Sequence, residues 1–265
     1  MKIIRKVLMF GRHAEVDYKS QPDNRVNPPI VAGSIKRIYS NQGSLVKRLL
    51  PKESLKPKHI YVRHSNAPRT KYTARAILAG SLDMLPIPET MGDLDALDFG
   101  GIEFNEDPNL NFSDLVLNYE LMKKEGYDAN LKRWHSDPFA TEHEGVTISP
   151  LAKIVESRGR YLAQELSDIL KGNSLLGVLA THGGIMDGLM AAAISSGDPL
   201  KSAQEISIMS PYFYPEQNAY VIIDQSEKSG SFSAELISED RKYPINVGNL
   251  ISLNWINNWM KDWRE

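Results

Sequence analysis

Three short apolar runs set the main limits on how this chain can fold. Residues 7–10, 60–62 and 175–180 are almost wholly apolar, which is typical of strands buried on both faces of a sheet. Helical patterns follow two of them, over residues 70–79 and 184–194. This β-α-β-α order predicts an α/β fold.

The second half of the chain adds a long helix and two more strands. Apolar residues recur at helical spacing over residues 151–170, and Gly172 is a suitable residue to end that helix. Residues 219–224 and 232–237 are strand-like, with a turn rich in Ser, Gly and Lys between them. We expect the long helix to be amphipathic and the two strands to belong to the same sheet.

Three other segments carry local signals. Residues 17–34 contain several prolines and predict a long surface loop. Ser40 has the chemistry of an N-cap and predicts the start of a helix that ends before Pro51. Three tryptophans spaced four residues apart predict a helix that packs on the core: Trp255, Trp259 and Trp263.

The middle of the chain breaks the α/β pattern. Residues 104–149 are more polar and predict only short helices, near residues 113–125 and 129–134. We interpret this stretch as a helical cap inserted at about residues 104–149 into a single domain of residues 1–265. A chain of 265 residues is long enough to bury one substantial core.

Composition excludes several classes of function. The chain has 31 basic and 33 acidic residues, so its net charge of −2 disfavours a nucleic-acid surface. It has no cysteine, which excludes disulfides, thiol catalysis and cysteine-bound metals. No stretch approaches the ~20 apolar residues of a membrane helix. We therefore expect a cytoplasmic protein that binds neither nucleic acid nor membrane; its oligomeric state stays open.

Polar residues follow each of the three apolar runs. Arg12 and His13 follow the first, Ser65 and Arg69 the second, and Thr181-His182-Gly183-Gly184 the third. Ligands of open α/β sheets bind at the carboxyl ends of the strands. If the three strands are neighbours, two histidines and two arginines meet at one edge of the sheet.

Such a cluster is suited to a phosphoryl group. The guanidinium groups of Arg12 and Arg69 can each grip two phosphate oxygens, and the backbone N–H of Gly183 can bind an anion. One imidazole, neutral at its attacking nitrogen, can form a phosphohistidine, while a second, if protonated, can donate to the phosphate. Two arginines would repel a metal ion, and no metal-ligand motif occurs, so we expect neither metal nor cofactor.

The chain resembles the histidine phosphatase superfamily, which includes the phosphoglycerate mutases. The resemblance covers roughly residues 6–223 and consists of five segments in family order: Arg12-His13-Ala14-Glu15, Tyr39-Ser40-Asn41-Gln42-Gly43, Ser65 with Arg69, Thr73 and Ala74, residues 97–103, and Thr181-His182-Gly183-Gly184. It implies a phosphoglycerate mutase-like fold, which is a three-layer sandwich around a mainly parallel central sheet. It also implies that His13 is the nucleophile and that Arg12, Arg69 and His182 complete the phosphate site.

One family residue is missing. The glutamate that protonates the leaving oxygen in the family would fall at Ala96, and alanine cannot transfer a proton. A one-residue shift would allow Asp95 to act as the general acid. The sequence thus predicts a phosphatase for a small phosphate monoester, with a mutase or a weakly active phosphate-binding protein as alternatives.

The remaining histidines belong to no motif. His64 borders the Ser65 segment and is left undecided, whereas His59, His135 and His143 are interpreted as structural. Arg25, in the proline-rich loop, is interpreted as a solvated surface residue.

Overall fold

The computed structural model describes residues 2–17, 28–111, 124–126, 129, 133, 136–137, 140–148, 150–197, 216–238 and 241–252. The chain forms two compact units. The first contains Met1–Asn111, Asp168–Gly183 and Tyr214–Lys242, and the second contains Phe112–Ser167, Gly184–Phe213 and Tyr243–Glu265. All the residues predicted to bind phosphate lie in the first unit.

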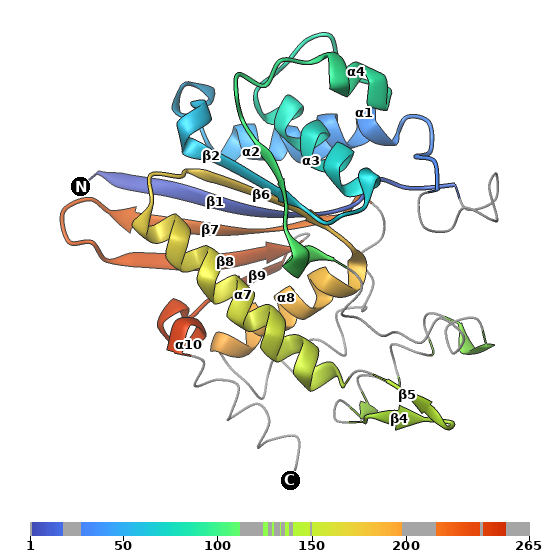
Figure 1. Ribbon diagram of the computed structural model, residues 1–265. Helices are drawn as coiled ribbons and strands as arrows, with labels where there is room; N and C mark the ends of the chain where they lie inside the picture. The colour runs from blue at the N-terminus through green and yellow to red at the C-terminus, as the bar shows by residue number, and fades with distance from the viewer. Residues whose placement is uncertain are drawn as a thin grey trace. The chain divides into compact units, whose positions relative to one another are not determined.

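A mixed sheet organises the first unit (Figure 1). Its strands are β1 (Ile3–Arg12), β2 (Ile60–His64), β3 (Phe104–Glu106), β6 (Leu176–Thr181), β7 (Asn218–Ser226), β8 (Phe232–Ser238) and β9 (Arg241–Pro244). The order is β3-β2-β6-β1-β7-β8-β9. Strands β3, β2, β6 and β1 are parallel, whereas β7 and β8 pair antiparallel. The predicted α/β class with a parallel core of strands is confirmed.

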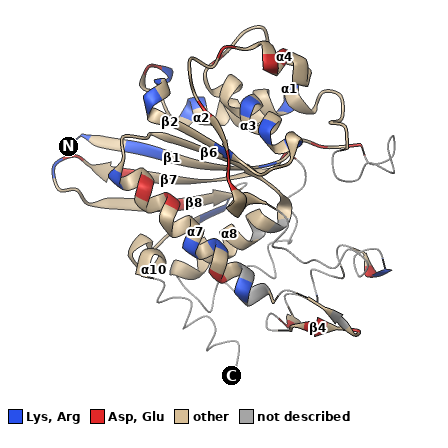
Figure 2. Ribbon diagram, viewed as in Figure 1, with Lys and Arg blue, Asp and Glu red and all other residues tan. Residues whose placement is uncertain are grey.

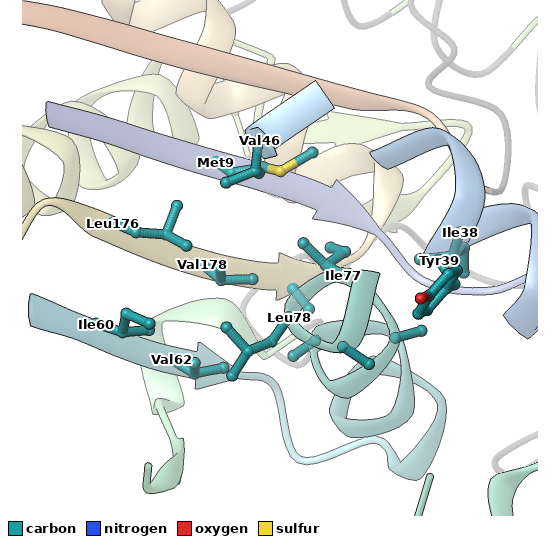
Figure 3. Close-up of a cluster of buried hydrophobic side chains, with 14 of the residues drawn as sticks. Met9, Ile38, Tyr39, Val46, Ile60, Val62, Ile77, Leu78, Leu176 and Val178 are labelled. Carbon is teal, nitrogen blue, oxygen red and sulfur yellow. The ribbon is translucent and has the colours of Figure 1, made fainter. Parts of the chain in front are cut away.

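Helices of the first unit cover one face of the parallel strands (Figure 1). They are α1 (Ser34–Ile38), the π-helical segment η1 (Tyr39–Gly43), α2 (Ser44–Leu49) and α3 (Pro68–Ser81). Figure 3 shows Met9 of β1 beside Val46 of α2, and Val178 of β6 near Ile77 and Leu78 of α3. Alternate residues of each strand point to this face, so the helices and the sheet share one apolar core.

The first helical segment begins earlier than the sequence predicted. Ser40 is not an N-cap: it is an exposed residue inside η1, and the helical run starts at Ser34. Gly33 occupies the N-cap position with a φ of 79°. The left-handed backbone of Gly33 allows the helix to start without a capping side chain. In a sequence, a glycine indicates an N-cap less clearly than a serine does. The predicted end is confirmed, since Leu50 is extended before Pro51.

Short elements connect the larger ones in the first unit. They are η2 (Lys52–Ser54), η3 (Pro57–His59), α4 (Met91–Ala96) and η4 (Pro108–Leu110). Thr90 and Asp93 form a capping box at the start of α4, which fixes where this helix begins.

The long helix α7 (Leu151–Lys171) confirms the predicted amphipathic segment. Val155, Leu162 and Leu166 are buried at helical spacing. Its last residues lie in the first unit, where the amine of Lys6 donates to the carbonyl oxygens of Ile169, Leu170 and Gly172 at 2.6, 3.2 and 3.0 Å. This lysine satisfies carbonyls that the helix end leaves without an intrahelical donor.

The second unit also contains α8 (Gly183–Gly197) from its second residue onward, α10 (Val247–Ser252) and a small hairpin of β4 (Glu142–His143) and β5 (Val146–Thr147). No helix among the described residues is long and apolar enough to cross a membrane.

The start of the predicted cap belongs to the sheet. Phe104–Glu106 forms β3, parallel to β2, and residues up to Asn111 lie in the first unit. A strand of three residues has too few alternations to be visible in a sequence. The helices predicted near 113–125 and 129–134 lie mostly outside the described residues, as do the loop residues 18–27 and the three tail tryptophans. The single domain and its cap stay predictions.

Candidate active site

Two histidines meet at the ends of two neighbouring strands. Arg12 ends β1 opposite Thr181, which ends β6, and His13 and His182 follow them. The backbone N–H of His13 donates to the carbonyl of Thr181 at 2.9 Å. The two imidazole centroids are 5.2 Å apart, and the side chains of both residues are buried. The sheet register therefore brings together the histidines that the sequence predicted as partners.

The next strand adds Ser65 and Arg69 to the histidines. Strand β2 pairs with β6, and the N–H of Ser65 donates to the carbonyl of Ala180 at 3.1 Å. Arg69 lies in the first turn of α3, one of the basic helices in Figure 2. Its Nη2 lies 3.5 Å from Nδ1 of His182. The predicted meeting of the three strand ends is thus observed.

Gly183 makes room for Arg12. A Cβ atom at this position would lie 3.2 Å from Cζ and 3.3 Å from Nη1 of Arg12. The sequence predicted that the backbone N–H of Gly183 binds an anion. In the structure, the missing side chain first admits the guanidinium that would hold the phosphate. Arg12, His13, Arg69 and His182 together are called the histidine–arginine cluster below.

The His13 ring is held in one tautomer. Its Nδ1 lies 2.7 Å from the carbonyl oxygen of Ala14, and a carbonyl only accepts hydrogen bonds. Nδ1 therefore carries the ring proton and Nε2 keeps its lone pair. Thr73 fixes this backbone in turn, since its hydroxyl accepts from the N–H of Ala14 at 2.7 Å and donates to the carbonyl of Arg69 at 2.8 Å.

Burial and the arginines keep both imidazoles neutral. Burial, followed by the positive charge of Arg69, holds the pKa of His13 well below its ordinary value of 6.5. Burial, Arg69 and Arg12 lower the pKa of His182 to about 3. At neutral pH without a bound anion, the positive charge of the cluster thus comes from its arginines. The low pKa of His182 disfavours the protonated ring that the sequence hypothesis allowed.

Glu216 supports the loop that carries His13 and was missed by the sequence analysis. Its N–H donates to the carbonyl of His13 at 3.2 Å, and its φ is 69°. Arg37 donates to its carboxylate through Nε at 2.8 Å and Nη2 at 2.6 Å. Gln42 donates to its carbonyl at 2.6 Å. Glu216 lies far from His13 in the chain and in no motif, so the sequence carries no signal for it.

Asp95 has partners outside the histidine–arginine cluster. Its carboxylate accepts from the hydroxyl of Tyr72 at 2.8 Å and forms an ion pair with Nη1 of Arg75 at 3.4 Å. Both partners lie on α3, whose first turn carries Arg69. Within the part of the chain that is described, Asp95 forms no hydrogen bond or ion pair with either histidine of the cluster. Its role as general acid stays a prediction.

The other histidines contact backbone or acidic groups. Nδ1 of His64 lies 2.7 Å from the carbonyl of Ser65, and Nδ1 of His59 lies 3.1 Å from that of Ser54. His143 approaches Glu125 at 2.8 Å in the second unit. Ligand atoms of Glu125, His143 and Glu144 lie within 4.8 Å of one another, but Lys124 and Arg133 pair with the same two carboxylates. His135 and Arg25 lie outside the described residues.

A hollow of about 460 Å³ lies on another part of the first unit. It is lined by residues of β1, β7, β8, β9 and α2, with Tyr220 and Ile222 among them. None of its lining residues belongs to the histidine–arginine cluster.

Comparisons with known proteins agree with this arrangement at the level of the fold. No protein-family model matches the sequence, and no curated protein does. Among solved structures, mycobacterial hydrolase 2 matches with a TM-score of 0.50 and 14% identity, over 96% of this chain and 98% of that one. A mycobacterial glucosyl-3-phosphoglycerate phosphatase also matches with a TM-score of 0.50 and 14% identity, over 87% of this chain and 97% of that one. These structures belong to the histidine phosphatase superfamily. The chain therefore has the histidine phosphatase fold.

Proposed function

We propose that this protein hydrolyses phosphate monoesters through a phosphohistidine at His13. One observation carries the proposal: the buried imidazole of His13 is neutral, with Nδ1–H bound to Ala14 and the Nε2 lone pair left for attack. The arginines of the cluster supply the positive charge that a phosphate dianion needs. A neutral imidazole beside two guanidinium groups is the arrangement that phosphoryl transfer to nitrogen requires.

The reaction would proceed in two displacements. In the first, Nε2 of His13 attacks phosphorus, the bond from phosphorus to the ester oxygen breaks, and that oxygen leaves with the electron pair. The ring becomes cationic, and the Ala14 carbonyl that accepts from Nδ1–H stabilises this charge. In the second, water attacks phosphorus, gives its proton to solvent, and the P–N electron pair returns to Nε2. Arg12 and Arg69 would hold the phosphoryl oxygens in both steps.

The identity of the proton donor affects which esters react fastest. Position 96 is alanine, and Asp95 contacts Tyr72 and Arg75. A general acid typically contributes ~10²- to 10⁴-fold to the rate, and its contribution is smallest for leaving groups that are stable as anions. We therefore expect p-nitrophenyl phosphate to react readily and esters of simple alcohols to depend on Asp95.

We further infer that the natural substrate is a small phosphorylated metabolite. One neighbour of the same fold is named as a phosphatase of glucosyl-3-phosphoglycerate, which is a small phosphate monoester. Among transfer reactions, a mutase would pass the same phosphoryl group from His13 to a second hydroxyl. The two activities differ only in the acceptor, so the product decides between them.

The first prediction concerns His13. The purified protein is incubated with p-nitrophenyl phosphate and with a panel of sugar and nucleotide phosphates, and released phosphate and acid-labile phosphoprotein are measured. We expect turnover and a trapped phosphohistidine. His13→Ala should lower turnover at least ~10³-fold because no other group replaces the nucleophile.

His59→Gln is the matched control. His59 also bonds a backbone carbonyl through Nδ1, but it precedes β2, whereas His13 follows the end of its own strand. Its replacement should leave turnover unchanged. Undiminished activity in His13→Ala would refute the mechanism. Tight phosphate binding without turnover on any substrate would instead favour a phosphate-binding protein, and transfer to added hydroxyl compounds without released phosphate would favour a mutase.

A further inference from the structure

Two buried hydroxyls lie behind His182. Ser65 and Thr70 are both 0% exposed. Oγ of Ser65 lies 2.9 Å from Nε2 of His182 and 2.9 Å from Oγ1 of Thr70. The three groups therefore form a chain of hydrogen bonds from α3 to the ring of His182.

The contacts of Thr70 determine which group donates in each of these hydrogen bonds. Its Oγ1 lies 2.6 Å from the carbonyl of Ala67 and 3.0 Å from the carbonyl of Ser65. Both carbonyls only accept, so the single hydroxyl hydrogen of Thr70 points to one of them. Thr70 then has no hydrogen for Ser65, and Ser65 must donate to Thr70. Oγ of Ser65 is left as an acceptor toward His182, whose Nε2 therefore carries the ring proton.

The position of Arg69 beside the other ring nitrogen of His182 agrees with the Nε2–H tautomer. Nη2 of Arg69 lies 3.5 Å from Nδ1, and a guanidinium group only donates. Nδ1 is therefore an acceptor. The low pKa of His182 agrees with a neutral ring that carries one proton. The two imidazoles of the cluster thus hold opposite tautomers, Nδ1–H in His13 and Nε2–H in His182.

We propose that Ser65, oriented by Thr70, is a positioning residue that holds His182 as the Nε2–H tautomer, so that the Nδ1 lone pair lies beside Arg69 where the phosphoryl group would bind. The functional part of this inference rests on the function proposed above. A lone pair repels a phosphate oxygen unless a proton lies between them. The bound phosphoryl group therefore shares one proton with Nδ1, as P–O–H···N or as P–O⁻···H–N⁺.

The charged and titratable groups around this nitrogen support a shared proton. Arg69, Arg12 and His13 act electrostatically on the two imidazoles. None of these three groups is an anion that would compete for the proton. Since a phosphate monoester has its second pKa near ~6, the protein must take up a proton when it binds the dianion above that pH.

The test measures the tautomers directly. The full-length protein is labelled with ¹⁵N in histidine, and two-bond ¹H–¹⁵N couplings show which ring nitrogen carries the proton in the unliganded protein; His182→Asn assigns the signals. We expect Nε2–H for His182. In Thr70→Val the Ser65 hydroxyl loses its acceptor and turns to donate to Nε2, so His182 should switch to Nδ1–H. Thr70→Ser keeps the hydroxyl and should keep Nε2–H.

Ser65→Ala completes the set of variants. It removes the hydroxyl that accepts from Nε2–H of His182, and the loss of this buried hydrogen bond should lower the affinity for inorganic phosphate about tenfold. Calorimetry in buffers of different ionisation enthalpy should show uptake of about one proton per phosphate at pH 8 by the wild-type protein. Thr70→Ala replaces Thr70→Val if the valine side chain disturbs folding. The expected result is the same, a switch of His182 to Nδ1–H.

His13 serves as the internal control. Its Nδ1–H···O=C bond to Ala14 does not involve Ser65 or Thr70, so its Nδ1–H signal should be unchanged in every variant that keeps the site folded. Nδ1–H for His182 in the wild-type protein, or unaltered Nε2–H in both Thr70→Val and Thr70→Ala, would overturn the proposal. Because no substrate is present, these outcomes are separate from a failure to find phosphohistidine at His13.

Discussion

At the residue scale, the absence of a side chain at Gly183 leaves space for the guanidinium group of Arg12. A Cβ atom here would approach Cζ, Nη1 and Nε of Arg12 at 3.2, 3.3 and 3.4 Å. Such distances are too short for ordinary packing, so the guanidinium would have to move by a few tenths of an ångström. Glycine is needed at this position for the space that it leaves to Arg12, and not for an unusual backbone conformation.

We therefore predict that Gly183→Ala weakens phosphate binding without unfolding the protein. A small displacement of Arg12 should lower the affinity for inorganic phosphate about tenfold, measured by calorimetry, because charge-assisted hydrogen bonds depend strongly on geometry. The melting temperature should stay close to that of the wild type, since alanine is favoured in a helix. Gly248→Ala is the control, since the one described atom that its Cβ would meet is Asn246 Oδ1 at 3.5 Å. Equal phosphate affinity in Gly183→Ala and the wild type would contradict this role of Gly183.

At the element scale, the contact between α3 and η1 depends on two glycines. A Cβ atom on Gly80 would lie 2.2 Å from the carbonyl oxygen of Tyr39, and one on Gly43 would lie 2.5 Å from Cα of Gly80. The two helical segments therefore touch through their backbones. This contact sets the position of α3, the helix whose first turn carries Arg69 and Thr70.

Gly80→Ala should destabilise the protein although alanine is the better helix former. The clash is with backbone atoms that cannot rotate away, so we expect a loss of roughly 2 kcal/mol in the free energy of unfolding, measured by urea denaturation. Gly92→Ala in α4 is the matched control: its Cβ would meet only Thr90 Oγ1 at 3.7 Å. That change should be neutral or should stabilise by about 0.5–1 kcal/mol. Similar effects of the two substitutions would show that helix propensity, not packing, dominates at Gly80.

At the scale of the whole molecule, the buried histidines make stability depend on pH. Both pKa values are lowered in the folded protein, that of His182 to about 3 and that of His13 well below 6.5. In the unfolded chain both rings titrate near their ordinary value of 6.5. Below that pH the unfolded state binds protons that the folded state does not. The contribution of the two histidines to the free energy of unfolding is therefore fully present above about pH 6.5. It is lost progressively as the pH falls toward their pKa values in the folded protein.

We predict that the free energy of unfolding falls by about 3 kcal/mol between pH 6.5 and pH 5 because of these two histidines, at a limiting slope of about 1.4 kcal/mol per pH unit for each. Urea denaturation at the two pH values measures the change. The double variant His13→Gln, His182→Asn should lack this part of the pH dependence. Added phosphate should oppose the loss in the wild type, since an anion in the cluster favours the protonated rings. An identical pH dependence in the double variant would contradict the prediction.

Much of the fold was predictable because its signals are local. The apolar runs of β1, β2 and β6, and the periodic pattern of α7, each lie within one short segment. The helical start at Ser34 and the strand β3 were not predicted, because a glycine N-cap and a strand of three residues leave little pattern in a sequence. Arg12, His13, Arg69 and His182 were predicted because each lies shortly after an apolar run that the sequence shows clearly.

By itself, the sequence determined which residue types follow the buried strands, and hence that two histidines and two arginines would meet if those strands were neighbours. Only the tertiary structure decided that they are neighbours, that Glu216 holds the His13 loop, that Gly183 admits Arg12, and that the two imidazoles hold opposite tautomers. The physical reason is that apolar burial is encoded along a segment, whereas the direction of a hydrogen bond depends on which donor and acceptor atoms meet from distant parts of the chain.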